Sequence, residues 1–241
     1  MRKVVIIPTY NEIENVSAMI DKVLSLEGDF HLLFIDDSSP DGTAEVVKKR
    51  MEENHDRIFL IQRVGKLGLG TAYIAGFKWA IERKYDYIFE MDCDFSHNPD
   101  DLLRLLDSAR MGNDVVVGSR YVKGVNVVNW PMSRLLLSYC ASKYVRKVSG
   151  MKVADATAGF VCYSRKVLET IDLDAIQMKG YGFQIEMKYS AIVLGFSLDE
   201  VSIIFTDRRE GTSKMSSGIF GEAFFGVLKL PLRKIRARKD I

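Results

Sequence analysis

The stretch LLFIDDSSPDGT, residues 32–43, indicates the fold of this chain of 241 residues. Its first four residues are apolar, and a polar segment rich in Asp, Ser and Gly begins at residue 36. A short apolar run that stops at turn-forming residues is typical of a buried strand in a parallel sheet. Runs of the same kind occur at residues 4–7, 59–61, 87–91 and 115–117. The sequence therefore predicts a series of short buried strands.

Amphipathic segments separate these predicted strands. Ile13, Val16 and Ile20 fall on one face at helical spacing, as do Leu102 and Leu105 further along the chain. Strands that alternate with helices predict an α/β fold, with a mainly parallel central sheet and helices on both faces. In such a sheet ligands bind beyond the carboxyl ends of the strands, so the residues that follow each strand are the first candidates for function.

The composition is that of a globular protein with a sizeable core. Apolar residues make up 47% of the chain and charged residues 27%, which excludes wholesale disorder. No apolar run is long enough to span a bilayer, and the first one is too short for the core of a signal peptide. Cys93, Cys140 and Cys162 lack metal-ligand spacing, so we expect a reduced protein inside the cell.

The net charge of +2 hides a basic C-terminus. The last 13 residues hold six Lys or Arg and one Asp, so they carry +5, while the other 228 residues carry −3. A basic tail suits nucleic acid, an anionic membrane surface or simple solvation. Nucleic acid is disfavoured because the body of the chain is acidic and no aromatic residues interleave with a basic stripe.

Residues 219–230, just before the basic cluster, are rich in Phe, Leu and Ile. Such a segment is too short to cross a bilayer, but it can lie in the interface with the cations at the headgroups. The alternative is a core helix followed by a solvated tail. We expect a catalytic domain at residues 1–215 and an amphipathic, basic membrane-association tail at residues 216–241.

Polar segments follow four of the predicted strands: PTYNE (residues 8–12), DDSSPDGT (36–43), DCD (92–94) and GSRY (118–121). Caps and turns use the same residue types, which is an adequate explanation for Asp41 and Thr43 before a helix. It does not explain Asp92 and Asp94, because neighbouring carboxylates repel each other unless a cation lies between them. Mg²⁺ or Mn²⁺ binds through one or two carboxylates together with water and substrate phosphates. The pattern therefore predicts a nucleotide-phosphate site with a divalent metal.

The glycine-rich segment GKLGLG, residues 65–70, is a weaker signal. It fails the spacing of a dinucleotide-binding loop, and the chain contains no P-loop motif. We interpret it as a flexible loop before a helix that starts near Thr71.

The polar segments, with GK-x-GLG among them, stand in the same order in glycosyltransferase family 2, which the chain resembles over residues 4–215. Later segments are similar to the dolichol-phosphate (polyprenol-phosphate) mannose synthases: WPMSRLLLS (residues 130–138), DATAGF (155–160), GYGFQIE (180–186) and FTDRREGTSK (205–214). This resemblance implies a GT-A fold, a Rossmann-like α/β sandwich. It also implies transfer of mannose from GDP-mannose to a polyprenyl phosphate with inversion at the anomeric carbon.

The resemblance assigns the donor site residue by residue. The guanosine would be held by Pro8, Tyr10, Glu12, Ile35 and Asp37. Asp92 and Asp94 would coordinate a Mg²⁺ or Mn²⁺ ion that bridges the diphosphate, with Cys93 between them contributing only its backbone. Ser96 stands where archaeal relatives place a Gln on the metal, so it would bind the metal directly, through water or not at all. Arg208 and Lys214 would reach the phosphates from a C-terminal loop, and Lys66 would be a further donor-side cation.

The acceptor site is implied in the same way. Arg120, Arg134 and Ser138 match the positions that bind the lipid phosphate, and Arg suits phosphate because its planar fork donates two parallel hydrogen bonds. The expected catalytic residues are Asp94, Arg120, Arg208 and Lys214. A phosphate monoester is already largely anionic at neutral pH, so no general base is required. Asp155 and Glu186 are base-like alternatives for which capping or hydrogen bonding is at least as good an explanation.

Two other functions stay open at this level. One is a UDP-sugar-dependent transferase of the same fold, for example a glucosyltransferase that acts on polyprenyl phosphate. The other is a non-catalytic nucleotide-sugar-binding subunit, which the intact Asp92, Asp94, Arg208 and Lys214 disfavour. Relatives carry C-terminal spanning helices or rely on anchoring subunits, so we expect peripheral attachment at the cytoplasmic face of the membrane, with an anchoring subunit as a possible partner.

Overall fold

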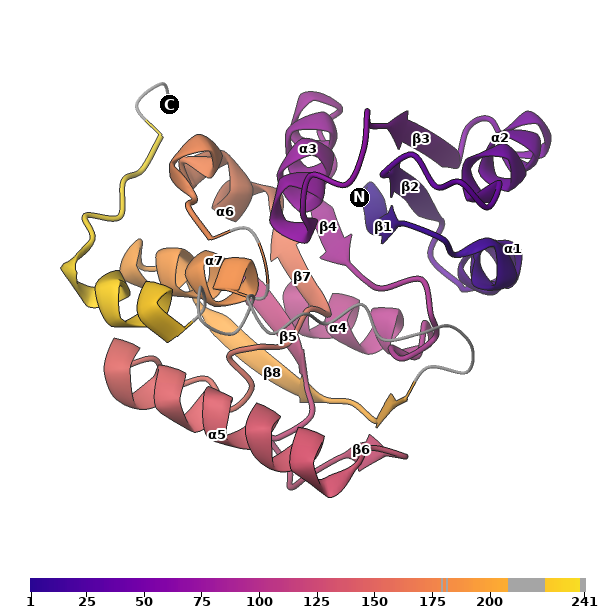
Figure 1. Cartoon of the computed structure of the whole chain (residues 1–241). Helices are drawn as coiled ribbons and strands as arrows, with labels where there is room; N and C mark the ends of the chain where they lie inside the picture. The colour runs from indigo at the N-terminus through magenta and orange to yellow at the C-terminus, as the bar shows by residue number, and fades with distance from the viewer. Residues whose placement is uncertain (179, 181, 208–223, 239–241) are drawn as a thin grey trace.

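The computed structural model describes residues 1–178, 180, 182–207 and 224–238. Its centre is a seven-stranded sheet with the order β3-β2-β1-β4-β7-β5-β8 (Figure 1). β7 is antiparallel to both of its neighbours, and the other pairings are parallel. The strands are β1 (Lys3–Thr9), β2 (Phe30–Asp36), β3 (Ile58–Gln62), β4 (Tyr87–Glu90), β5 (Val115–Ser119), β7 (Val161–Ser164) and β8 (Leu198–Ser202). The predicted mainly parallel α/β sheet is therefore confirmed.

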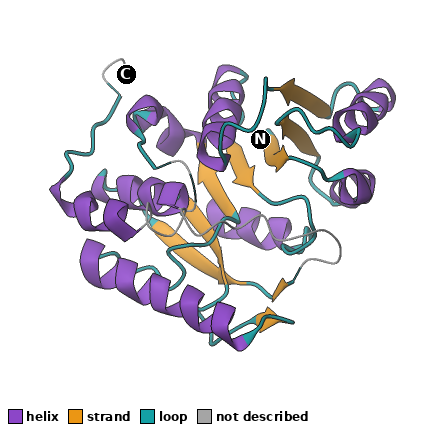
Figure 2. Ribbon diagram, viewed as in Figure 1, coloured by secondary structure: helices purple, strands orange, loops and turns teal. Residues whose placement is uncertain are grey.

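Helices cover both faces of the sheet (Figure 2). One face packs against α1 (Ile13–Leu24), α2 (Thr43–Glu53) and α4 (Asp101–Arg110), and the other against α3 (Leu69–Glu82), α6 (Arg165–Thr170) and α7 (Gly182–Val193). Alternate residues of β1 belong to the two resulting cores, because successive side chains of a strand point to opposite faces. Both faces are thus buried, which explains the uninterrupted apolar runs in the sequence.

A third apolar cluster joins α5 (Met132–Ser149), α7 and the C-terminal segment. Residues 224–229 are helical, and Val227 and Leu230 are buried against Val145, Met178 and Ile185. A side chain at Gly226 would collide with Met178, so glycine allows this close approach. The short elements β6 (Val127–Val128) and β9 (Phe205–Thr206) form a second, parallel pair, and η1 (Leu173–Ala175) and η2 (Leu230–Leu232) are single 3₁₀ turns.

The C-terminal segment is bound to the body of the protein by polar contacts as well. Arg233 forms an ion pair with the buried Glu186 (2.8 Å), and the backbone of Ala237 bridges to Ile171. The predicted boundary at residue 215 lies outside the described residues, so the division into domain and tail stays a prediction. No helix in the described ranges has both the length and the hydropathy that crossing a bilayer requires.

The structure confirms all five strands that the apolar runs predict, and adds β7 and β8 to the same sheet. β4 ends at Glu90, so Met91 lies just beyond it, and α3 begins at Leu69 rather than near Thr71. β7 and β8 were not predicted: LDEVS in β8 mixes polar and apolar residues, whereas VCYS in β7 is a mainly apolar run that is not among the predicted strands. The antiparallel direction of β7 has no signature in local composition.

Candidate active site

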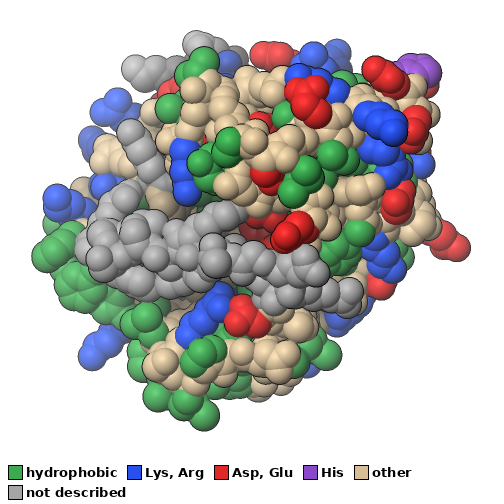
Figure 3. All heavy atoms as spheres, turned by 45° about the vertical axis from the view of Figure 1, so that its right-hand side comes forward, with side chains coloured by type: hydrophobic (Ala, Val, Ile, Leu, Met, Phe, Trp, Pro, Cys, Tyr) green, Lys and Arg blue, Asp and Glu red, His purple; other side chains and the backbone are tan. Residues whose placement is uncertain are grey.

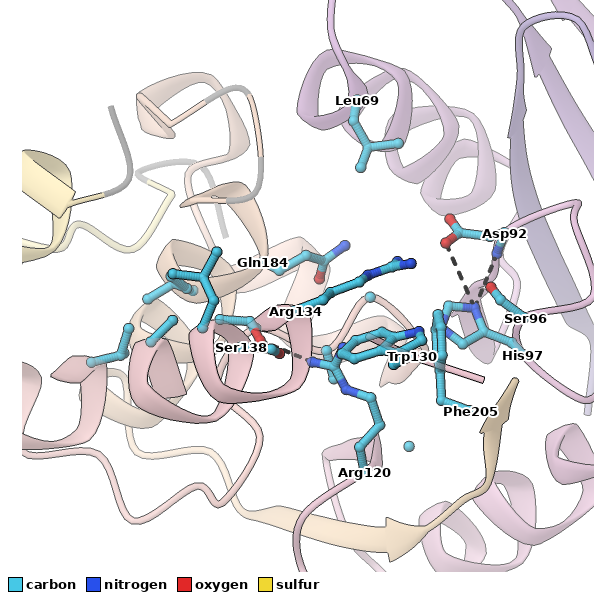
Figure 4. Close-up of a pocket in the computed structure, with 18 of the residues that line it drawn as sticks. Leu69, Asp92, Ser96, His97, Arg120, Trp130, Arg134, Ser138, Gln184 and Phe205 are labelled. Carbon is cyan, nitrogen blue, oxygen red and sulfur yellow. Dashed lines mark hydrogen bonds and ion pairs between the residues drawn. The ribbon is translucent and has the colours of Figure 1, made fainter. Parts of the chain in front are cut away.

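A cavity of about 680 Å³ opens beyond the carboxyl ends of β4 and β5 (Figure 4). Its volume is in the range of small-molecule sites. One end is lined by the polar groups of Asp92, Asp94 and Ser96, and Arg120 and Arg134 approach it from β5 and α5. The other end is apolar and lies between α5 and the C-terminal helix, where it is lined by Leu137, Ala141, Tyr144, Val145, Phe224 and Val227. The cavity thus joins an acidic end, a cationic middle and an apolar end.

The acidic end is shaped by an unusual turn after β4. Phe95 has a left-handed backbone (φ 57°), a conformation that is rare for a bulky residue and is often found at functional sites. This turn lets the backbone N–H of Ser96 donate to Asp94 Oδ1 (3.1 Å). Cys93, between the two carboxylates, packs into the core, as expected if only its backbone serves the site.

The donor set at this turn fits a hard divalent cation. Asp92 and Asp94 supply carboxylate oxygens, and the buried Ser96 Oγ has no hydrogen-bond partner in the described part of the chain. Among the residues that the structure describes, no three His, Cys, Asp or Glu side chains converge as metal ligands. A metal here would therefore take further ligands from water and substrate phosphates, as Mg²⁺ usually does.

His97 supports the same turn, although no sequence pattern singles it out. The backbone N–H of Asp92 donates to His97 Nδ1 (3.3 Å), and the ring stacks on Phe160 at 5.0 Å between centroids. Burial lowers the pKa of His97 to about 4, although the charge of Asp94 acts in the opposite direction. The imidazole is therefore neutral at pH 7 and acts as an acceptor that positions the Asp92 backbone.

Arg120 and Asp155 form a buried, bidentate ion pair. Arg120 Nε donates to Asp155 Oδ2 (2.6 Å) and Nη2 to Oδ1 (2.7 Å), while Nη2 also donates to Thr157 Oγ1 (2.9 Å). Burial opposes ionisation of Asp155, but the charge and hydrogen bonds of Arg120 outweigh it, so the pKa of the carboxyl is lowered. Within the described ranges Arg120 Nη1 has no acceptor and is available to a ligand in the cavity.

Arg134 projects from α5 into the cavity, where Trp130 lies between it and Arg120 (Figure 4). The guanidinium carbons of Arg134 and Arg120 are 4.2 and 5.4 Å from the centroid of the Trp130 ring. Arg134 also donates to Asp207 Oδ1 (2.8 Å). Ser138 lies one helical turn further along α5 and lines the cavity as well. The structure thus brings together the three predicted acceptor residues, whose roles stay predictions.

The predicted guanosine residues meet at the carboxyl ends of β1 and β2, outside the lining of the cavity. Pro8 and Ile35 are register partners in this strand pair. Tyr10 lies just beyond β1, with Lys66 Nζ 4.8 Å from its ring centroid. The backbone N–H of Glu12 donates to Thr43 Oγ1 (3.0 Å), which ties the β1 end to the start of α2.

Asp37 at the end of β2 is already engaged by a cation. Arg63 Nε donates to Asp37 Oδ1 (2.6 Å), and Arg63 Nη1 donates to Thr71 Oγ1 (2.7 Å). The neighbouring Asp36 is fully buried and accepts from Ser39 Oγ and Thr9 Oγ1, so it holds the loop rather than a ligand. Asp37 therefore has a fixed orientation at the edge where the resemblance places the base.

The remaining predicted residues divide into two groups. Asp155 and Glu186 both act as hydrogen-bond acceptors in the structure, which agrees with the hydrogen-bonding role that the sequence offered as the alternative to a general base. Glu186 Oε2 accepts from the backbone N–H groups of Gln177 and Met178, and Oε1 is paired with Arg233. Arg208 and Lys214 lie outside the described residues, so their predicted contacts with the donor phosphates have no structural account here.

Lys188 is a buried cation that sequence reasoning missed. Its Nζ donates to the backbone carbonyls of Ala158 (2.6 Å), Gln184 (3.1 Å) and Ala156 (3.4 Å). Burial lowers the pKa of Lys188, and the charge of the buried Glu90 partly offsets this. Lys188 therefore fastens the DATAGF loop, which carries Asp155, to α7. Its helical position among apolar residues gives no hint of this role in the sequence.

Comparison with known proteins agrees with this architecture. The model of the family described as "Glycosyl transferase family 2" matches residues 4–172. A polyprenol monophosphomannose synthase of Mycolicibacterium smegmatis is 47% identical over 232 residues, with 96% of this chain and 88% of the relative covered. An undecaprenyl-phosphate mannosyltransferase of Micrococcus luteus is 45% identical over 229 residues, with 95% and 93% covered.

Solved structures show the fold. The glucosyl-3-phosphoglycerate synthase of Mycobacterium tuberculosis, crystallised with Mn²⁺, UDP-glucose and phosphoglyceric acid, superposes with a TM-score of 0.66. The match covers 96% of this chain and 79% of that one at 18% identity, so it concerns the fold alone. The predicted GT-A fold and the resemblance to polyprenol-phosphate mannose synthases are therefore confirmed. The chain belongs to glycosyl transferase family 2.

Proposed function

We propose that this protein transfers mannose from GDP-mannose to a polyprenyl phosphate, with inversion at the anomeric carbon. Relatives at 45–47% identity over nearly the whole chain carry names that state mannosyl transfer to such lipids. The single observation that carries the proposal is the cavity itself. It joins a metal-type carboxylate pair, two arginines and an apolar end within one continuous space.

The donor would lie across the carboxyl ends of β1, β2 and β4. Its guanosine would contact Pro8, Tyr10, Glu12, Ile35 and Asp37, and its diphosphate would point toward Asp92 and Asp94. Arg208 and Lys214 are proposed to contact the diphosphate as well. Asp92, Asp94 and Ser96 would hold Mg²⁺ or Mn²⁺, which when bound neutralises charge that builds up on the departing diphosphate.

The acceptor phosphate would be bound by Arg120 Nη1, Arg134 and Ser138. Arg120 is held rigidly by Asp155, so little side-chain entropy is lost when the phosphate binds. The phosphate is largely dianionic at neutral pH, so one of its oxygens attacks the anomeric carbon without a general base. Attack opposite the leaving diphosphate inverts the configuration at that carbon.

The isoprenoid chain would leave through the apolar end, between α5 and residues 224–230. Exposed apolar side chains continue outward from this end on both elements: Met132, Leu136, Leu137, Tyr139, Phe224, Phe225, Leu228 and Leu232. Hydrophobic side chains interspersed with Lys and Arg gather along the lower edge of the molecule, at the height of α5 (Figure 3). This surface suits peripheral attachment to an anionic membrane, proposed here to be the cytoplasmic face. An anchoring subunit is a further possible partner, and we propose no nucleic-acid partner.

The test is a donor panel. Purified protein is incubated with a short polyprenyl phosphate and GDP-mannose, UDP-glucose or UDP-GlcNAc, in Mn²⁺ or in EDTA. We expect glycolipid from GDP-mannose alone, and only in Mn²⁺. Turnover with a UDP-sugar instead would assign the chain to the alternative transferase. Nucleotide binding without turnover of any donor would favour a non-catalytic subunit.

A further inference from the structure

Besides Ser96 and Trp130, two side chains in the wall of the cavity have buried polar atoms without a hydrogen-bond partner among the described residues. Gln184, at the start of α7, is 2% exposed, and neither Oε1 nor Nε2 of its amide is bonded within the described residues. Tyr73, on α3, is fully buried, and its hydroxyl is likewise unpaired in that part of the chain. A buried polar group left unpaired costs about 1–3 kcal/mol, so such groups in a native fold call for an explanation.

The Tyr73 ring and the Gln184 backbone are held in place by neighbouring residues. Phe183, the neighbour of Gln184, stacks on the Tyr73 ring at 6.0 Å and an interplanar angle of 8°. The backbone carbonyl of Gln184 accepts from Lys188 Nζ (3.1 Å). Burial raises the pKa of the neighbouring Glu90, while the charge of Lys188 and the Gln184 amide act in the opposite direction. Neither Glu90 oxygen has a hydrogen-bond partner in the described ranges. The Tyr73 ring and the Gln184 backbone are therefore fixed by packing, a feature typical of a site prepared for a ligand.

Their place in the cavity indicates which part of the substrates they meet. Gln184 and Tyr73 line the same cavity as Asp92, Asp94 and Arg134. In Figure 4 the end of the Arg134 side chain lies between the Gln184 amide and Asp92. In the proposed reaction, the donor diphosphate binds near Asp92 and Asp94 and the acceptor phosphate near Arg134, so the hexose that passes between them lies within this cavity, which Gln184 and Tyr73 line. A neutral amide, which both donates and accepts, and a phenol suit sugar hydroxyls rather than a phosphate.

We propose that the Gln184 amide, assisted by the Tyr73 hydroxyl, binds hydroxyl groups of the transferred hexose and helps to select it. This inference rests on the proposed transferase function and names the residues that recognise its sugar. If it is correct, replacing Gln184 weakens binding of the hexose moiety of the donor and leaves binding of the nucleotide moiety unchanged.

The test compares Gln184→Leu with the wild type by calorimetric titration of GDP and of GDP-mannose in Mn²⁺. Loss of neutral hydrogen bonds to the hexose should weaken GDP-mannose binding about tenfold or more and leave GDP binding unchanged. Tyr73→Phe should show the same selectivity to a smaller degree. The matched control is Gln177→Leu, because this exposed glutamine lies outside the cavity.

Donors that each lack one hydroxyl of the hexose identify the hydroxyl that Gln184 binds. The wild type should turn over one deoxy donor markedly more slowly, and Gln184→Leu should not distinguish that donor from the full sugar. Equal losses for GDP and GDP-mannose, or unchanged discrimination among the deoxy donors, would overturn the inference and assign Gln184 a structural role. If the wild type makes no lipid from GDP-mannose, the proposed donor fails separately, and the same comparison is made with the nucleotide sugar that it does use.

Discussion

Replacing Asp155 by Asn tests how the cationic middle of the cavity is built. Asp155 is fully buried and accepts two hydrogen bonds from the Arg120 guanidinium and one from the Arg120 backbone N–H (3.0 Å). The variant keeps the shape of the side chain but leaves a buried guanidinium without its counter-ion. Removing one partner of a buried ion pair typically destabilises a protein by 3–5 kcal/mol.

We therefore expect Asp155→Asn to lower the free energy of unfolding by about 3 kcal/mol. For a chain of this length that corresponds to a fall in Tm of roughly 6–12 °C. Urea unfolding followed by far-UV circular dichroism measures the change. The control is Asp174→Asn, which breaks the exposed pair with Lys78 and should cost less than about 1 kcal/mol.

A double-mutant cycle with Arg120→Gln separates the ion pair from other effects of each change. Because both single variants remove the same interaction, the double variant should be more stable than the sum of the two losses predicts. Asp155→Asn should also raise the KM for lipid phosphate more than the KM for donor. A loss below about 1 kcal/mol, or strictly additive effects, would refute the reasoning that this pair preorganises Arg120.

Asp94→Ala should reduce transfer at least about 100-fold by removing a metal ligand, and near-normal turnover in Mn²⁺ would contradict the metal assignment. Arg134→Ala should raise the KM for acceptor more than for GDP-mannose in steady-state kinetics, whereas the reverse pattern would move the acceptor site elsewhere. The side chains of Phe225 and Leu232 are 63% and 87% exposed. The double variant Phe225→Glu with Leu232→Glu should sediment less with anionic liposomes and keep its affinity for GDP. Unchanged sedimentation would show that this surface does not contact the membrane. Burial lowers the pKa of His97 from 6.5 to about 4, so as the pH falls the unfolded chain binds a proton at His97 before the folded chain does. The free energy of unfolding should therefore fall by about 2 kcal/mol between pH 7.5 and pH 5. His97→Phe should lack this part of the loss.

The fold could be predicted from the sequence where each strand is buried on both faces. The runs at residues 4–7 and 32–35 are uniformly apolar because their side chains enter two cores, and Ile13 to Val23 mark their helix by spacing alone. β8 was not predicted because its sequence, LDEVS, places two acidic residues in a half-buried edge strand. The direction of β7 depends on how the chain returns after α5, which no local pattern encodes.

The site could be predicted where a sequence pattern would be energetically unfavourable without a ligand, as for the neighbouring carboxylates of Asp92 and Asp94. It could not be predicted where partners come from distant elements. Asp155 meets Arg120 across 35 positions of sequence, and Lys188 is satisfied entirely by backbone carbonyls. Gln184 stands out only once its burial and its unpaired amide are known. Such relations exist in the packed molecule and leave no mark on composition or spacing.

The most direct test of the account is the identity of the product. Purified protein, GDP-mannose, Mn²⁺ and a short polyprenyl phosphate are incubated together, and the glycolipid is analysed by mass spectrometry and by the one-bond C1–H1 coupling of its sugar. The account predicts one mannose per lipid phosphate in the β configuration, opposite to the donor, and no product in EDTA. A product with retained configuration, or mannose released to water while the lipid phosphate stays unmodified, would contradict it.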